Sequence, residues 1–421
     1  MSSVFLDKNI YKKEIVFFLI LYTSLIISFF LGENSTGGAI GDYINQKRAS
    51  QAFASEFLKT FFEYDTYGTR HSPILIIFLS LFEKIKLPDV FIRLIHLHLA
   101  LFLPFIFYKC LSVKFKEIDK KILFFLSCLI FLSPTFRSLA IWPDSRLLGL
   151  ILFVTSIYYF LKFEESKNFK FAIYNVIFLA LSAYLSPNFS VFSIYFFTKF
   201  VFNYGILSKK IFYIITINFV LALPIFYYIF VLDVNFLLKS AAIGIEENEK
   251  IIFNNLFNDI LITFSIIFFY LIPFIFLKII RIKNIFNLKE ILISISIFSI
   301  CVFYFDYNYF YSGGGIFFKV SNFFFNNNYL FYLISFFAIL FTYTLISEKY
   351  LNILLFVIII LNNPQYTIYH KYFDPFLLIA FFTIFSFNID LKKIFQAKNY
   401  LLVFTYFLFF LFISNLKLIY V

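Results

Sequence analysis

Side chains able to carry out acid–base chemistry gather in the first long polar segment of the chain, residues 32–72, which follows an apolar run. Asp42 lies in a glycine-rich part of this segment, which closes on Arg70 and His71 just before a Ser-Pro pair. A carboxylate near the mouth of a helix bundle can accept a proton from a hydroxyl group. Because proline is common at the first position of a helix, we expect Arg70 and His71 at a helix N-terminus, which favours phosphate. Two plainer interpretations stay open, a solvated Asp42 and an Arg70 that only anchors the chain at a membrane surface.

A second polar segment, residues 133–149, carries Arg137, Asp144 and Arg146 between two apolar runs. Arginines can bind a phosphate through two parallel hydrogen bonds, and Asp144 would add a second acid to the site. The alternative is that Asp144 caps a helix and that the arginines extend toward lipid headgroups. The sequence leaves both interpretations open.

A third polar segment, residues 362–374, places His370, Lys371 and Asp374 at the mouth of two apolar runs. A charged side chain within hydrocarbon costs about 2.5–3.5 kcal/mol on insertion scales, so this trio indicates water or a bound ligand. A position at the membrane surface would lower that cost and is the alternative.

Other residue types argue against several classes of site. Cys110, Cys128 and Cys301 are scattered through apolar sequence, without the spacing of a disulfide framework or a metal site. His96 and His98 lie two residues apart in one apolar run and therefore point to different faces of a helix. The chain contains no phosphate-binding loop of the GxxxxGK[ST] type, so we expect no nucleotide cofactor.

The composition is that of a helical membrane protein. The 421 residues are 62% hydrophobic and 14% charged, whereas soluble domains carry about 25% charged residues. Apolar runs of roughly 15–22 residues recur along the chain, which is typical of repeated membrane crossing. The net charge of +12 comes mainly from basic residues in short segments between these runs, as in cytoplasmic loops, so we do not expect nucleic-acid binding.

The basic segments also predict the topology, an all-α bundle of about 13 spans with both a cytoplasmic N-terminus and an outward C-terminus. Residues 15–31 are expected to form an uncleaved first span, and residues 73–82 a short helix at the outer membrane surface. The three polar segments then share the outer side. The remaining spans are expected at 88–109, 121–135, 146–162, 171–186, 189–205, 211–232, 260–278, 290–305, 330–347, 350–362, 375–390 and 400–418.

The order of the first span, the polar segments and the short apolar helix resembles the GT-C superfamily of membrane glycosyltransferases. This superfamily includes protein O-mannosyltransferases and the aminoarabinose transferases of lipid A. The likeness covers roughly residues 10–205, and the rest of the chain is similar only in having many spans. We therefore expect a catalytic membrane module at 1–205 and a variable membrane module with short outer loops at 206–421. The matching elements are Gly41–Asp42–Tyr43, Arg70–His71–Ser72–Pro73, Ser133–Pro134, Trp142–Pro143–Asp144–Ser145–Arg146 and Tyr184–Leu185–Ser186–Pro187–Asn188.

The resemblance implies transfer of a sugar, with inversion, from a polyprenyl-phosphate donor to a hydroxyl group of a lipid or surface glycan. The reaction would take place on the extracytoplasmic face, for which a bacterial inner membrane is the expected location. Asp42 would be the catalytic base, and Asp144 would position the acceptor or a divalent metal, which some relatives bind and others do not. The candidate ligands of the donor are Arg70, His71, Arg137, Arg146, His370 and Lys371.

Two other functions compete with sugar transfer. A polymerase or ligase of surface polysaccharide would also have many spans, but it would rely on arginines in large late loops, and the late outward loops here are short and lack arginine. A lipid-linked sugar transporter or flippase would place polar residues around a central cavity, and no inverted repeat is evident in the sequence.

Overall fold

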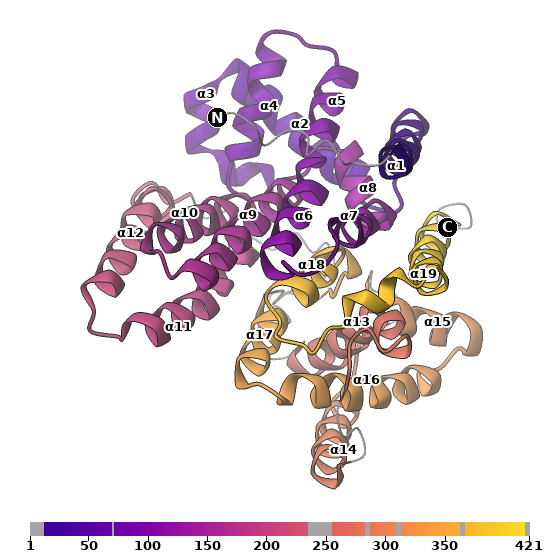
Figure 1. The fold of residues 1–421 in the computed structure, drawn as a ribbon. Helices are drawn as coiled ribbons and strands as arrows, with labels where there is room; N and C mark the ends of the chain where they lie inside the picture. Colours follow the sequence, from indigo (N-terminus) through magenta and orange to yellow (C-terminus); the bar gives the residue numbers. More distant parts are fainter. Residues whose placement is uncertain are drawn as a thin grey trace.

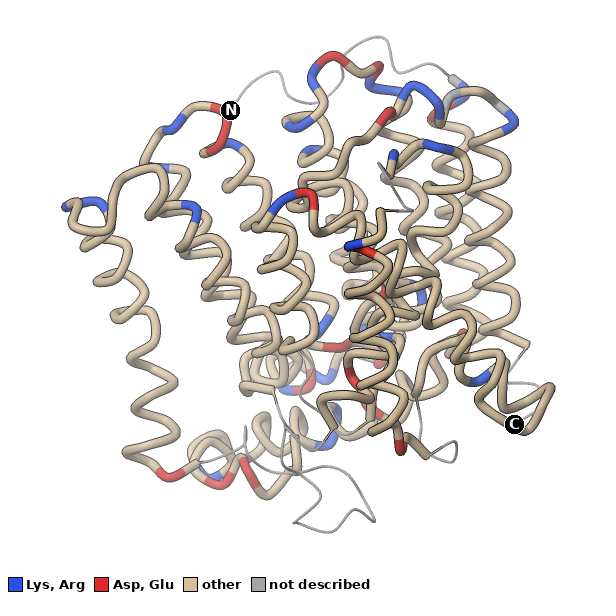
Figure 2. The backbone as a smooth tube through the Cα atoms, turned by 90° about the horizontal axis from the view of Figure 1, so that it is seen from below, with Lys and Arg blue, Asp and Glu red and all other residues tan. Residues whose placement is uncertain are grey.

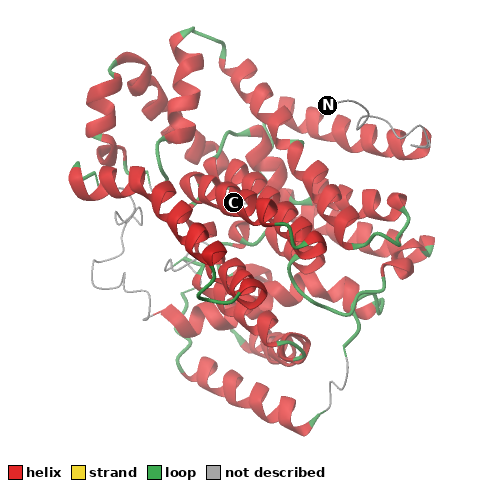
Figure 3. Ribbon diagram, turned by 60° about the vertical axis from the view of Figure 1, so that its left-hand side comes forward, coloured by secondary structure: helices red, strands yellow, loops and turns green. Residues whose placement is uncertain are grey.

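The structure is a computed structural model that describes residues 12–69, 71–234, 255–282, 287–308, 313–362 and 367–416. Within these ranges all regular elements are helices and there is no β-strand, which confirms the predicted all-α fold. Figure 1 shows the helices packed beside one another, and Figure 3 shows the short loops that join most of them. Arg70, one of the predicted site residues, lies outside the described residues.

The described part of the chain contains seven helical segments that are long and apolar enough to cross a membrane. Most expose apolar side chains, as lipid-facing helices do: in the first, only 22% of the span is buried. The chain is therefore a membrane protein with several helical spans. The seven contain α1 (Lys12–Leu31), α5 and α6 (Asp89–Ala100 and Phe102–Lys114), α9 (Ser145–Ser166), α12 (Lys209–Phe226), α13 (Leu256–Phe276), α16 (Tyr329–Ser347) and α19 (Ala397–Leu416).

The expected count of about 13 spans is not confirmed. Several expected spans are shorter helices than their apolar runs suggested, and a helix of 17 residues is only about 25 Å long. These are α10 (Phe169–Leu185), α11 (Ser193–Tyr204), α14 (Leu288–Phe303), α17 (Tyr350–Leu361) and α18 (Phe376–Thr383).

One expected span is broken. The run expected at 121–135 forms α7 (Lys120–Cys128) and a 3₁₀ turn (Leu129–Leu132), and the chain then bends by 68° into α8 (Pro134–Ile141). Ser133 caps α8 by accepting a hydrogen bond from Phe136 N, and Pro134 fits the first position of a helix, where no N–H is needed. This bend carries the segment 133–149 into the site described below.

The long polar segment after the first span is itself largely helical. It forms α2 (Ala39–Ser55) and α3 (Phe57–Phe62), and it leads into α4 (Ile74–Lys84), which corresponds to the short helix predicted at 73–82. Helix α4 buries one face, which includes Leu75 and Leu79, and packs beside α2 (Figure 1). The helices predicted in this segment are therefore present.

Closely packed helices position the polar segments. Helices α9 and α10 approach where Gly149 faces Ser186, and the Ser182 hydroxyl donates a hydrogen bond of 2.7 Å to the Gly149 carbonyl. One turn further along the same face of α9, the Phe153 ring stacks on that of Phe189, with the ring centroids 4.6 Å apart. These contacts hold the first half of α9 against α10 and against the turn that follows it (Pro187–Phe192).

Charged residues lie mostly toward two opposite ends of the helices, as the coloured backbone in Figure 2 shows. At one end the basic segments contact each other through ion pairs: Lys116 lies 2.8 Å from Glu165, and Arg281 lies 2.6 Å from Asp390. Helix α9 ends at this cluster and begins, at its other end, directly after Asp144. The predicted separation of the lysine-rich segments from Asp144 is therefore present in the fold.

Candidate active site

Asp42 and Lys371, which are 329 positions apart in the sequence, form an ion pair with 3.1 Å between Lys371 Nζ and Asp42 Oδ2. Asp42 lies in the first turn of α2, and Lys371 lies in a 3₁₀ turn, η7 (His370–Tyr372), that precedes α18. The Asp42 side chain is 40% exposed and that of Lys371 is 15% exposed. The site therefore contains an accessible carboxylate beside a largely buried cation.

Asp144 is the N-cap of α9, where its Oδ1 accepts a hydrogen bond of 2.7 Å from Arg146 N. Its side chain is buried. Burial alone would raise the pKa of Asp144, but the nearby Arg146 guanidinium and the backbone hydrogen bond outweigh it and hold the pKa below its ordinary value. Asp144 is therefore an ionised carboxylate at neutral pH, and its capping role, the alternative given by the sequence, is present in the structure.

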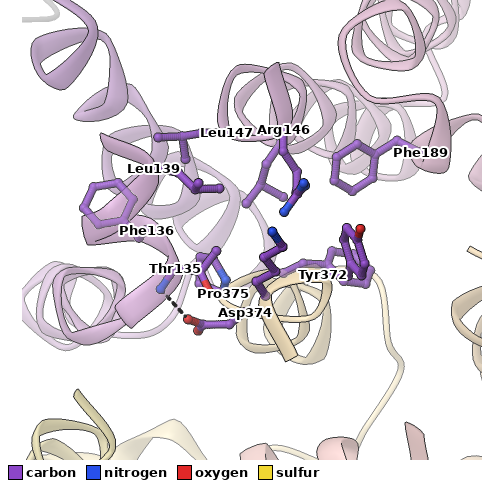
Figure 4. Close-up of a pocket in the computed structure, with 12 residues that line it drawn as sticks. Thr135, Phe136, Leu139, Arg146, Leu147, Phe189, Tyr372, Asp374 and Pro375 are labelled. Carbon is purple, nitrogen blue, oxygen red and sulfur yellow. Dashed lines mark hydrogen bonds between the residues drawn. The ribbon is translucent and has the colours of Figure 1, made fainter. Parts of the chain in front are cut away.

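Arg146 extends from the first turn of α9 into a small cavity, with its guanidinium 4.6 Å from the centre of the Tyr372 ring. Its Nη1 is closed off from solvent and has no hydrogen-bond partner among the residues that the structure describes. Figure 4 shows Arg146 and Phe189 on one side of the cavity and Tyr372 and Pro375 on the other. Lys371 also lines this cavity, whose volume of about 20 Å³ has room for about one water molecule.

His71 lies at the same place, close enough to Asp144, Arg146 and Asp42 to interact with their charges. Burial lowers the pKa of His71, and the opposing influence of Asp144 does not restore it, so the imidazole is neutral at pH 7. Its Nδ1 is buried without a partner in the described part of the chain. A short hydrogen bond from the Ser72 hydroxyl to the Tyr184 carbonyl holds this corner against the end of α10.

The turn before α18 is fixed by Asp374. Its Oδ2 accepts a hydrogen bond of 2.6 Å from the Ser133 hydroxyl. It also accepts one of 3.0 Å from Thr135 N, which Figure 4 marks with a dashed line. These bonds attach the segment that carries Lys371 and Tyr372 to the start of α8. Sequence reasoning noted the acid in its charged trio but assigned it no role, because its partners are 239 and 241 residues away.

Two of the predicted ligands lie away from this site. Arg137 donates to Glu33, with Nε 2.9 Å from Oε2, and its other nitrogens bond Ser24 and Ser28 of α1. The side chain of His370 faces α13 and α19, where its Nε2 lies 3.0 Å from the Tyr270 hydroxyl and its ring packs against Phe410. Neither is placed to share a ligand with Arg146.

Sequence reasoning missed Glu33, the partner of Arg137. The only signal was indirect: Ser24 and Ser28 are four residues apart and therefore lie on one face of a helix, where they can bind a buried cation together. Arg137 is thus a structural residue in this fold.

Trp142 connects α2 to the segment that carries Asp144. Its indole N–H donates to the Glu33 carbonyl at 2.9 Å, and its ring lies 5.9 Å from that of Tyr43. The Arg93 guanidinium of α5 covers the indole at 3.5 Å from the ring centre. Because Tyr43 follows Asp42 and Trp142 precedes Asp144 by two residues, this ring contact holds the segments that carry the two acids against each other.

The acids of the site do not form a divalent metal site. Within the described ranges no three His, Cys, Asp or Glu side chains lie close enough together to hold a metal ion. The ammonium of Lys371, rather than a third acid, lies against Asp42. The described residues therefore do not fit the divalent metal that the resemblance left open.

Comparisons with protein-family models, with curated proteins and with solved structures found no match to this chain.

Proposed function

We propose that this protein is a membrane glycosyltransferase that moves a sugar from a polyprenyl-phosphate donor to a hydroxyl group of a lipid or surface glycan. The proposal rests on one observation: Asp42, Lys371 and Arg146 lie together at one end of an apolar helix bundle. A carboxylate that water can reach lies beside two cations, and one guanidinium nitrogen has no partner in the described structure. An anionic substrate with a lipid tail fits this combination of charge and surroundings.

In the proposed reaction the acceptor oxygen attacks the anomeric carbon of the donor sugar from the side opposite the phosphate. A new carbon–oxygen bond forms as the bond from that carbon to the phosphate oxygen breaks, so the configuration is inverted. Asp42 takes the proton of the acceptor hydroxyl, a role that typically contributes about 10²- to 10⁴-fold in rate. Arg146 and Lys371 stabilise the negative charge that grows on the departing phosphate.

The remaining side chains support these three. Asp144 lies near Arg146 and balances its charge. Neutral His71 would offer its Nδ1, which has no partner in the described part of the chain, to a sugar or acceptor hydroxyl. We place the site on the extracytoplasmic side of a bacterial inner membrane, because the lysine-rich segments lie at the other end of the helices.

The test is transfer by the purified protein. The wild-type chain, reconstituted in liposomes, is incubated with radiolabelled polyprenyl-phosphate hexoses and a membrane lipid extract as acceptor. We expect labelled product from the wild type and from Glu56→Gln, whose exposed side chain pairs with Lys59, and a loss of 10²-fold or more in Asp42→Asn. Transfer retained by Asp42→Asn would remove Asp42 from its role, and no transfer from any of these donors would overturn the proposal.

A further inference from the structure

We infer that Lys371 is shared between Asp42 and the donor phosphate, so that binding of the donor uncovers the base. The inference rests on the proposed function. It concerns the ion pair seen in the structure, in which Lys371 Nζ lies on Oδ2 of the carboxylate that would have to receive a proton.

Among the residues that the structure describes around the cavity, the positive and negative charges are balanced. The charge of Asp144 is balanced by the nearby Arg146, Asp42 pairs with Lys371, and His71 is neutral. A phosphate that binds Arg146 and Lys371 therefore competes with the two carboxylates for these cations. The observations below indicate that it competes with Asp42.

A phosphate would displace Asp144 from its cation less readily than it would displace Asp42. Asp144 is 2% exposed and caps α9 by accepting a hydrogen bond from Arg146 N. If Arg146 left it, the carboxylate would remain charged in a buried site where water does not solvate it. Asp42 is 40% exposed, so water can solvate its carboxylate when Lys371 leaves. Ion pairs with both side chains exposed contribute about 0.2–1 kcal/mol, and the accessible carboxylate brings this pair closer to that range than to a fully buried pair. A phosphate can therefore displace Asp42 from Lys371.

Lys371 could contact the same ligand as Arg146. It lines the same cavity as Arg146, whose free Nη1 offers the first hydrogen bond to a phosphate oxygen. A phosphate that bonds both side chains would draw the ammonium away from Asp42 Oδ2. The acceptor hydroxyl could then approach that oxygen, which Lys371 covers in the structure described here.

This arrangement predicts how variants of Asp42 and Lys371 bind a polyprenyl monophosphate. Asp42→Asn, which removes the proposed base, should bind a polyprenyl monophosphate about two- to five-fold more tightly than the wild type, because the phosphate no longer competes for Lys371. Lys371→Met should weaken binding. In the Lys371→Met background, Asp42→Asn should not tighten binding, because the ammonium for which the carboxylate and the phosphate compete is absent.

The experiment measures the dissociation constant of a fluorescent short-chain polyprenyl monophosphate for the four proteins in lipid nanodiscs. Glu56→Gln, at the other end of α2, is the control for the loss of one exposed negative charge. Thermal unfolding of each variant checks its fold, and Lys371→Arg checks that a cation in this place restores binding. Equal tightening by Asp42→Asn in both backgrounds would mean a general field effect and would overturn the inference. Unchanged or weaker binding by Asp42→Asn would also overturn it, with the proposed function intact. No binding by the wild type would overturn the proposed function itself.

Discussion

The guanidinium of Arg137 lies against the carboxylate of Glu33, with Nε 2.9 Å from Oε2, and each of the two side chains is only 6% exposed. The pair joins α8 to the end of α1, and the Ser35 hydroxyl donates a further bond of 2.9 Å to Glu33 Oε1. A buried pair of this kind matters most when one partner is lost, because the other charge is then left unpaired.

We therefore predict that Arg137→Met destabilises the fold by about 3–5 kcal/mol, since Glu33 would remain as an uncompensated buried acid. The double variant Glu33→Gln with Arg137→Met should recover much of this loss. The midpoint of thermal unfolding in detergent measures both. If the double variant were as unstable as the single one, the ion pair would not be the cause.

A second prediction concerns the contact between α9 and α10. A Cβ added at Gly149 would lie 2.7 Å from the Ser186 Cβ and 3.3 Å from its backbone nitrogen, so Gly149→Ala forces the two helices apart. Overpacking of this kind costs about 1–3 kcal/mol, and we expect a lower unfolding midpoint. Gly149→Ala combined with Ser186→Gly, which removes the opposing Cβ, should restore part of the stability; a failure to do so would place the strain elsewhere.

A third prediction concerns acid stability. Burial lowers the pKa of His370 to about 3, whereas the unfolded chain takes up a proton at about 6.5. The contribution of His370 is therefore complete above pH of about 6.5 and falls by about 1.4 kcal/mol for each pH unit below it, until the folded pKa is reached. His71, whose pKa is also lowered by burial, acts in the same direction.

His370→Gln keeps a hydrogen-bonding group near the Tyr270 hydroxyl but cannot take up a proton. We expect the variant to lose stability more slowly than the wild type when unfolding is followed from pH 7 to pH 5. The same slope in both proteins would mean that His370 is already charged or already solvated in the folded state.

The parts of the fold that depend on local sequence could be predicted. The helix at α4 and the long apolar spans follow from the proline at position 73 and from the length of apolar runs. The break at Ser133–Pro134 was not predicted, because it falls within an apolar run that was expected to form one span at 121–135. The number of spans could not be predicted, because an apolar run shows that a segment is buried in lipid or protein but not where its helix ends. Helix α18, for example, has only eight residues, all of them buried within the protein.

The site could be predicted only as a set of candidates. Sequence placed Asp42, Asp144, Arg146 and Lys371 on one side of the membrane, and the structure brings them together. Which cation pairs with which acid depends on tertiary contacts between distant segments, and charge alone gave no reason to pair Lys371 with Asp42 or Arg137 with Glu33. Whether the assembled residues transfer a sugar stays a prediction.

A fourth prediction separates a positioned guanidinium from a simple positive charge at Arg146. Arg146→Met should lower kcat/KM for sugar transfer by about 10²- to 10³-fold, as the loss of one positioned donor to a developing anion does. Arg146→Lys keeps the charge but lacks the planar group that lies over Tyr372 and presents Nη1, so it should recover only part of the rate. Arg48→Met, at an exposed position of α2, is the control. Full activity of Arg146→Lys would show that charge alone is sufficient.

A fifth prediction concerns the side of the membrane on which the site lies, because a polyprenyl-phosphate donor and an outer acceptor require Asp42 and the lysine-rich end to face opposite compartments. Single cysteines at Glu56 and at Lys116, whose side chains are 61% and 56% exposed, report the two ends. The three native cysteines are buried and should contribute little background. A membrane-impermeant maleimide added to intact cells should label Glu56→Cys at once and Lys116→Cys only after the membrane is permeabilised. The reverse pattern would place Asp42 in the cytoplasm, where a hydroxyl acceptor of the outer surface could not reach it.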